Sequence, residues 1–207
     1  MPVVAVVNPK GGVGKTTLAT NLAGYFAGRK HRTMLGDFDR QQSARHWLGL
    51  RPQGVAPIET WTSDGGSMRP PRGVTHVVLD TPAQIHGKHL RDVVRVADRI
   101  VVPLTPSLFD VMATQRFLEE LAGEFDSKAR FADTVGIVGM RVDTRTKSAE
   151  QLSRFVVSLG LPVAGYLRDT QNYVHLAAHG LTVFDVPSTR VDKDRETWEP
   201  LLGWILH

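Results

Sequence analysis

Short, continuously apolar runs alternate with amphipathic stretches along the chain. Six of these runs have the length and β-branched composition of strands: VVAVVN, TMLGDF, THVVLD, RIVVPL, VGIVGM and LPVAGY. A continuous apolar run is typical of a strand in a parallel sheet that is buried on both faces. The pattern therefore predicts a sheet built mostly from parallel strands.

Between these runs, apolar residues recur at helical spacing. The predicted helices cover residues 15–28, 41–48, 87–97, 109–125, 147–159 and 170–179. Strands that alternate with helices predict an α/β fold, with a mostly parallel, twisted sheet flanked by helices on both faces. At 207 residues, with no internal repeat or convincing linker, we expect one domain that covers residues 1–207.

Two segments depart from this alternation. Residues 51–73 contain four prolines and a DGG turn, so we expect a long surface excursion with one short strand near residues 58–61. The final stretch, RETWEPLLGWILH, has apolar residues at helical spacing: Trp198, Leu201, Leu202 and Ile205. We expect a final helix that closes the core. The alternative, an amphipathic membrane anchor, would need several basic residues, and the stretch offers Arg195 and His207.

The composition narrows the chemistry. The chain is 42% hydrophobic and 22% charged, which is typical of a soluble globular protein, and it begins without a signal-peptide pattern, so we expect it in the cytoplasm. It has no cysteine, which excludes disulfides, thiolate zinc sites, cysteine nucleophiles and cysteine-ligated iron–sulfur clusters. The net charge of +4 favours a polyanionic partner such as nucleic acid. Neither half of the chain is a basic tail, so folding must assemble any basic patch.

The stretch VVAVVNPKGGVGKTTLATNLA has the order of a phosphate-binding loop: strand, glycine-rich turn, helix. Backbone N–H groups of such a turn and of the helix N-terminus cradle phosphate anions. Lys15 would place a cation on the β and γ groups, and the Thr16 hydroxyl would ligate Mg²⁺. The cofactors we expect are ATP and Mg²⁺. The residues expected to contact the nucleotide are Lys10, Gly11, Gly12, Val13, Gly14, Lys15, Thr16 and Thr17.

The loop also carries a second lysine at its mouth. Pro9 occupies the first glycine position of GxxxxGK[ST], whereas KGGxGKT fits without exception. The chain thereby resembles the deviant Walker A ATPases of the ParA/MinD family. The resemblance implies that Lys10 reaches across a dimer interface to the partner's nucleotide, so that two subunits sandwich ATP. Lys10 would repel Lys15 unless phosphate charge offset it, and opposite developing charge it would act as an arginine finger does.

Acidic residues follow two of the predicted strands. Asp37 and Asp39 share a face at the end of the second strand, where ligands bind in folds of this kind. By the resemblance, Asp39 matches the residue that orients or activates the attacking water, and Asp37 the residue near Mg²⁺. Arg40 stands where the family usually has proline. Asp80 ends an apolar strand as in a Walker B motif, whose carboxylate holds Mg²⁺ through its water shell.

These motifs assign the expected roles. Lys10, Lys15 and Asp39 are the expected catalytic residues. The expected metal ligands are Thr16, Asp37 and Asp80.

Two further segments resemble the family in part. Thr81, Pro82 and Ala83 resemble the switch segment that senses the γ-phosphate. VVPLTPSLFD resembles the PxxPSxxD signature, in which Asp110 opens a helix where an acid is favourable; a structural connection and an interface role are both open. Family members often carry an Asn-Arg pair near adenine. Here Met140 precedes Arg141, so only Arg141 carries over.

The resemblance implies the function of a small ParA-type ATPase. Because cysteine is absent, the cluster-bearing and thiolate-using relatives of this fold are excluded. An ATP-bound homodimer would bind nonspecific nucleoid DNA. A ParB-like or other cargo-bound adaptor would stimulate hydrolysis and release, and these cycles would position a plasmid, a chromosome or an assembly such as a carboxysome. No stable membrane binding is expected, and the ATP state would be nucleoid-associated.

Sequence-independent DNA binding requires Lys and Arg that face phosphates. The candidates, which lie in the C-terminal third, are Arg141, Arg145, Lys147, Arg154, Arg168, Arg190, Lys193 and Arg195. Two other functions remain open. One is a MinD-like membrane-associated organiser, and the other is a metabolic P-loop synthetase of the same fold group, whose ATP turnover would depend on a small carboxylic or amine substrate.

Overall fold

A computed structural model describes the protein except for residues 1, 40, 62–71 and 144. Seven strands form one sheet in the order β3-β2-β4-β1-β5-β6-β7, and every neighbouring pair is parallel. The strands are β1 (Val3–Val6), β2 (Thr33–Asp37), β3 (Glu59–Trp61), β4 (His76–Asp80), β5 (Arg99–Leu104), β6 (Val135–Gly139) and β7 (Val163–Tyr166). The parallel sheet and the short strand near residues 58–61 are confirmed. Residues 62–71 of the expected excursion, and Arg40, lie outside the described residues.

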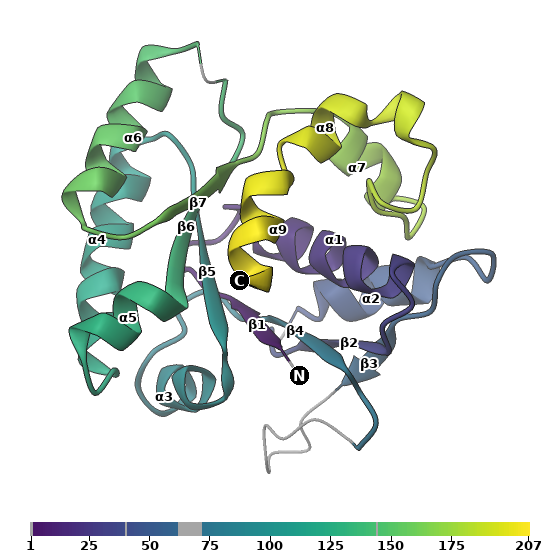
Figure 1. Ribbon diagram of the computed structural model, residues 1–207, viewed down its shortest axis with the longest axis horizontal. Coiled ribbons are helices and arrows are strands. Elements are labelled where there is room, and N and C mark those ends of the chain that lie inside the picture. Colours follow the sequence, from purple (N-terminus) through teal and green to yellow (C-terminus); the bar gives the residue numbers. More distant parts are fainter. Residues whose placement is uncertain (1, 40, 62–71, 144) are drawn as a thin grey trace.

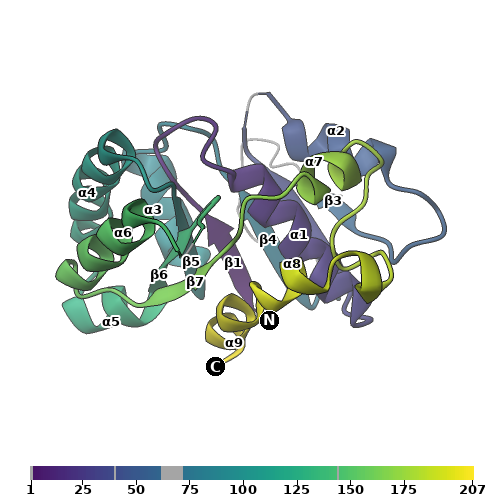
Figure 2. The same ribbon diagram turned by 90° about the horizontal axis from the view of Figure 1, so that it is seen from above.

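Helices cover both faces of the sheet (Figures 1 and 2). One face carries α1 (Lys15–Gly28), α2 (Ser43–Leu50), α7 (Asn172–Ala177), α8 (Asp192–Glu196) and α9 (Glu199–Leu206), with the short 3₁₀ turn η1 (Ser188–Arg190) before α8. The other face carries α3 (Gly87–Val96), α4 (Leu108–Gly123), α5 (Lys128–Thr134) and α6 (Lys147–Ser158). The α/β prediction is confirmed. The sequence pattern missed α5, a short helix capped by the Ser127 hydroxyl, which accepts a hydrogen bond from the Arg130 N–H at 3.2 Å.

The strands divide their side chains between two apolar layers. Val3 and Ala5 of β1 belong to the layer beneath α3, α4 and α6, and Val4 and Val6 belong to the layer beneath α1 and α9. This alternation follows from the two-residue period of a strand. Because both layers are apolar, the strands read as continuous hydrophobic runs in the sequence.

The C-terminal helix closes one of these layers, as predicted. Leu201, Leu202 and Ile205 of α9 are buried, and α9 packs on β7. Trp198, just before the helix, is fully buried, and its indole N–H donates to the Tyr173 hydroxyl at 2.9 Å. Within the described part of the chain, no helix has both the length and the apolar character that crossing a bilayer requires.

The sheet register brings the predicted functional segments to one edge. Asp80 pairs with Val6 on one side and with Asp37 on the other. The glycine-rich loop after β1 and the acids that end β2 and β4 therefore meet at the carboxyl edge of three adjacent strands. Ligands bind at this edge in open α/β sheets.

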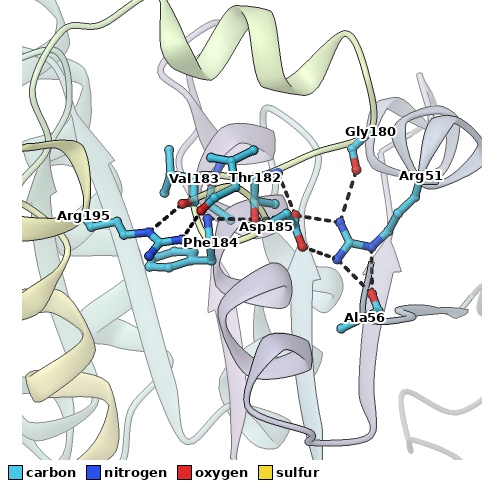
Figure 3. Close-up of polar contacts among 10 residues, drawn as sticks. Arg51, Ala56, Gly180, Thr182, Val183, Phe184, Asp185 and Arg195 are labelled. Carbon is cyan, nitrogen blue, oxygen red and sulfur yellow. Dashed lines mark hydrogen bonds and ion pairs between the residues drawn. The ribbon is translucent and has the colours of Figure 1, made fainter. Parts of the chain in front are cut away.

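A buried arginine fastens α2 to the segment that follows α7 (Figure 3). The Arg51 guanidinium forms a two-pronged pair with Asp185, at 2.8 and 2.9 Å, and also donates to the carbonyls of Ala56 and Gly180. These five contacts match the five N–H donors of an arginine. Asp185 in turn accepts from the Thr182 N–H and hydroxyl. The two backbones lie so close here that a Cβ on Gly180 would be 2.4 Å from the backbone nitrogen of Arg51.

Candidate nucleotide-binding site

The glycine-rich loop takes a conformation that only some residues allow. Gly12 and Gly14 have φ of +76° and +99°, in the left-handed region that favours glycine. Gly14 also has no room for a side chain, because its Cβ would lie 2.7 Å from the Met140 Cε. The buried Asn8 anchors the start of the loop: its side chain accepts from the Lys10 N–H at 2.8 Å and donates to the Pro103 carbonyl at 2.8 Å. Sequence reasoning missed Asn8, because no phosphate-binding motif includes it.

Lys15 and Thr16 lie at the start of α1, as the motif requires. The Lys15 ammonium donates to the Lys10 carbonyl at 2.7 Å, so this side chain folds back across the loop. Burial lowers the pKa of Lys15, while the charges of Asp80 and Asp39 act in the opposite direction. The lysine is thus held over the loop with two carboxylates near it. Such a cation is placed to receive phosphate oxygens.

Asp80 is the most deeply buried acid of the site. Its Oδ2 accepts a hydrogen bond from the Thr16 hydroxyl at 2.7 Å, and its Oδ1 has no hydrogen-bond partner among the described residues. Burial raises the pKa of Asp80, the Thr16 hydrogen bond lowers it in part, and the charge of Asp37 raises it. The net pKa is about 7. A buried carboxylate oxygen without a partner, next to a hydroxyl, fits a cation.

This donor set matches Mg²⁺ in particular. Mg²⁺ prefers oxygen ligands and is commonly held by one or two carboxylates together with water and substrate phosphates. No group of three His, Cys, Asp or Glu side chains arranged for a metal occurs among the described residues, so most ligands would come from phosphate and water. Thr16 and Asp80 are the residues that would hold the ion.

Asp37 differs from its expected role in one respect. Both of its oxygens accept backbone hydrogen bonds, from Asp39 N–H at 3.0 Å and from Arg45 N–H at 2.9 Å. It therefore shapes the turn that carries Asp39 and begins α2, and its charge acts on Asp80. Its role as a metal ligand stays a prediction. Asp39 lies at the rim of the cavity, and its Oδ1 accepts from the Gln41 N–H at 2.9 Å. Among the described residues its second oxygen accepts no hydrogen bond, so it can receive one from a water or a phosphate-bound group.

Lys10 has a counter-charge that the sequence did not predict. Its ammonium forms an ion pair with the Asp110 carboxylate, in the first turn of α4, while 44% of the Lys10 side chain stays exposed. Asp110 also accepts from the Thr105 hydroxyl. The expectation that only phosphate could offset this lysine is therefore wrong, because an acid far away in sequence reaches it. Asp110 therefore belongs to the site as the ion-pair partner of Lys10.

A cavity of about 710 Å³ extends from the loop to the segment after β7. Gly11, Lys15 and Thr17 line one end, and residues 168–171 with Tyr173 and Val174 line the other. Arg141 lies between them with φ of +54°, and its guanidinium donates to the Gly12 carbonyl. A volume of this size suits a ligand such as a nucleotide, with phosphates at the glycine-rich end and the base at the other. Arg141 lines the cavity, and its contact with adenine stays a prediction. Sequence reasoning missed the lining residues after β7, because they form no local motif.

The basic residues of the C-terminal third do not form one patch. Arg145 and Arg154 pair with acids on or beside α6, and Arg168 pairs with the buried Asp194 of α8, on the opposite face of the sheet. Arg195 points inward and donates to the carbonyls of Val183 and Val186, both at 2.7 Å (Figure 3). We therefore withdraw Arg195 from the DNA-binding candidates. The exposed candidates without an ion pair among the described residues are Arg141, which donates to the Gly12 carbonyl, and Lys147, Arg190 and Lys193.

The parallel sheet, the glycine-rich loop and the carboxylate pair at one edge define a P-loop nucleotide-binding protein. Residues 4–183 match the protein family described as the CobQ/CobB/MinD/ParA nucleotide binding domain. The chain belongs to this family, and the expected resemblance is confirmed. The carboxysome distribution protein A of Gloeobacter kilaueensis is 33% identical over 87% of this chain and 83% of that protein. The chromosome-partitioning ATPase Soj of Thermus thermophilus is 35% identical over 51% of this chain, but over only 32% of its own length.

Solved structures support the same fold. MinD in the MinC:MinD cell division complex of Aquifex aeolicus superposes with a TM-score of 0.74, at 15% identity, and covers 100% of this chain and 94% of that chain. A variant of the McdA protein of Cyanothece, solved in complex with ATP, gives a TM-score of 0.72 at 16% identity and covers 99% of this chain and 95% of that chain. At these identities the likeness shows the fold alone.

Proposed function

We propose that the protein is an ATPase that dimerises around ATP and uses this cycle to position a cargo. The observation that carries the proposal is the pair of lysines on one loop. Lys15 folds over the phosphate cradle, while Lys10 lies at its mouth with 44% of its side chain exposed. Among the described residues, the one ion pair of Lys10 is with Asp110. A cation in that place is free to exchange Asp110 for the triphosphate of a second copy.

The residues of the site divide the work of hydrolysis. The loop N–H groups and Lys15 would bind the β- and γ-phosphates and hold them in line. Bound Mg²⁺, held by Thr16 and Asp80, supplies charge neutralisation on the phosphate oxygens. Asp39 would orient the attacking water and accept its proton. Lys10 of each protomer would stabilise the charge that develops on the other protomer's phosphates.

The cargo and partners follow from the family and the charge. The carboxysome distribution protein matches this chain over most of both lengths, which favours a protein assembly as cargo, although a plasmid or chromosome would use the same cycle. The net charge of +4 favours nonspecific DNA as the track. A cargo-bound adaptor would trigger hydrolysis and release from the nucleoid. The membrane-associated alternative has less support, because Leu201, Leu202 and Ile205 of α9 are buried in the core.

The test compares three variants with the unsubstituted protein in ATP and in ADP. Lys15→Ala should lose nucleotide binding. Lys10→Ala should bind ATP but stay monomeric in sedimentation, and Asp39→Ala should form a long-lived ATP dimer with phosphate release reduced about 100-fold or more. Lys30→Ala, an exposed lysine beyond α1, is the matched control and should behave as the parent. An ATP dimer of normal affinity in Lys10→Ala, or equal DNA retention in ATP and ADP, would refute the proposal.

A further inference from the structure

Helix α3 has its apolar residues on the sheet side and its basic residues in solvent. Leu90, Val93 and Val94 are buried in the core layer beneath the helix. The exposed residues that we name the α3 basic face are Lys88, His89, Arg91 and Arg95. The one acid of the helix, Asp92, is partly buried. The helix is thus firmly seated while its cations stay accessible.

Two cations of the α3 basic face have no acidic partner in the described part of the chain. Arg91 has a marginal contact with Glu124 at 4.0 Å, and no ion pair within that limit involves Lys88 or Arg95. In the C-terminal third, by contrast, most arginines are neutralised by acids or directed inward. The unpaired cations of α3 thus share one helix. The unpaired candidates of the C-terminal third are divided, because Lys147 begins α6 whereas Arg190 and Lys193 belong to η1 and α8 on the opposite face of the sheet.

A second helix extends this surface. The Arg130 guanidinium of α5 donates to the Val94 carbonyl at the end of α3, at 3.5 Å, and Lys128 is exposed at the start of the same helix. Arg130 also pairs with Asp126 at 3.6 Å. Lys128 has no partner among the described ion pairs. Helix α5 therefore adds this cation to those of α3.

We propose that the α3 basic face binds the phosphate backbone of duplex DNA. This inference rests on the proposed function and assigns the surface on which that function would hold DNA. Lys88 and Arg95 are two helical turns apart, about 10 Å along the axis at ~1.5 Å per residue, which spans about three base-pair steps of ~3.4 Å. Such contacts to phosphates carry no sequence information, as nonspecific binding requires.

A lipid surface is the competing anionic partner. Interfacial helices combine their cations with exposed Trp, Phe or Leu side chains that insert among the acyl chains. None of the large apolar residues found exposed in the described chain belongs to α3, because Leu90, Val93 and Val94 all face the core. The composition of the face therefore favours DNA.

The segment that leads into α3 also borders the nucleotide cavity. Ala83 lines the cavity, and the Gln84 N–H donates to the Pro9 carbonyl of the glycine-rich loop at 3.0 Å. Gln84 and Gly87 have φ of +62° and +56°, so the connection turns sharply before the helix begins. Only a few residues therefore connect the phosphate end of the cavity to α3. A movement of this segment on nucleotide binding would shift α3 and alter its contact with DNA.

The experiment compares two double variants that lose the same charge at different places. Lys88→Gln with Arg95→Gln neutralises the α3 basic face, and glutamine keeps the helix propensity. Lys30→Gln with Arg116→Gln is the matched control, because both side chains are exposed and lie outside α3 and outside the C-terminal candidates. Affinity for a random-sequence DNA duplex is measured with a non-hydrolysable ATP analogue over a range of KCl concentrations. Unfolding midpoints verify that both variants fold.

We expect the α3 double variant to bind DNA at least about tenfold more weakly. The slope of log affinity against log salt should fall by about two for each protomer bound, since each lost phosphate contact removes about one. The control should keep the parental slope. Equal losses in both variants, or an unchanged slope in the α3 variant, would overturn the inference.

The controls distinguish a failure of the α3 assignment from a failure of the proposed function. If the unsubstituted protein binds no DNA in the ATP state, the proposed function itself fails. If it binds DNA and the α3 variant binds equally well, only the α3 assignment fails. Vesicles of phosphatidylserine and phosphatidylcholine form a further arm, in which a loss of vesicle binding with unchanged DNA binding would assign the face to lipid and overturn the inference.

Discussion

Two ion pairs of the molecule use the same chemistry in opposite ways. Arg51 and Asp185 are 5% and 3% exposed, and each has further hydrogen bonds to backbone groups. Lys10 and Asp110 are 44% and 10% exposed, and among the described residues only the acid has a second side-chain partner, Thr105. A buried charge with all its hydrogen bonds satisfied cannot leave without a large cost, whereas a half-exposed ammonium exchanges partners easily. Burial thus decides which pair holds the fold and which is available for function.

The largest expected effect comes from breaking the buried pair. Arg51→Ala leaves Asp185 buried with its charge uncompensated and removes hydrogen bonds to Ala56 and Gly180. We expect a loss of about 3–5 kcal/mol in the free energy of unfolding, measured by urea denaturation. The control is Arg32→Ala, whose pair with Glu59 is 52% and 42% exposed and should contribute less than about 1 kcal/mol. Similar losses in the two variants would contradict the distinction drawn from burial.

His76 extends the comparison to a buried base that has no acidic partner among the described residues. Its ring stacks on that of His31 with centroids 3.9 Å apart, and burial, followed by the charge of His31, lowers its pKa to about 4. Between pH 6.5 and 4 the unfolded chain binds a proton here that the folded protein does not, so stability should fall as the pH is lowered through this window. The effect should reach about 1–3 kcal/mol near pH 4.

The measurement for His76 is the difference in unfolding free energy between the parent and His76→Gln at each pH. Groups common to both proteins cancel in this difference, which isolates the histidine. His207→Gln, at the exposed C-terminal residue, is the control and should follow the parent curve. A His76→Gln protein with the parental pH dependence would show that folding leaves the pKa of His76 unchanged.

The smallest effect concerns the partly exposed pair of Lys10 and Asp110. Asp110→Asn keeps an acceptor for Thr105 but releases Lys10, so dimerisation no longer has to break an ion pair in either protomer. Breaking each pair should cost less than about 1 kcal/mol, and a dimer breaks two of them. The dimer of the variant should therefore form roughly tenfold more tightly in a non-hydrolysable ATP analogue, as measured by sedimentation equilibrium. Asp133→Asn, at a 77% exposed acid, serves as control. A weaker dimer in Asp110→Asn would mean that Asp110 belongs to the interface itself.

The phosphate end of the site was predictable because its residues are neighbours in sequence. The loop, Lys15 and Thr16 form one continuous motif whose spacing is dictated by a strand, a tight turn and a helix. Asp80 was predictable from the apolar strand before it, and the parallel sheet from the continuous apolar runs. The final helix followed from its periodicity. α5 escaped prediction, because only one turn of its short length carries an apolar pattern.

By itself, then, the sequence determined the layered fold and the phosphate-binding loop, since both follow from local patterns. Tertiary structure decided which charges meet. Thr16 and Asp80 are 64 residues apart, and Arg51 and Asp185 are 134 apart, so no periodicity relates them. The pairing of Lys10 with Asp110, the base end of the cavity and the free cations of α3 arise in the same way. Parallel strands with helical crossovers bring distant loops to one edge, and only the packed chain shows which side chains neutralise one another there.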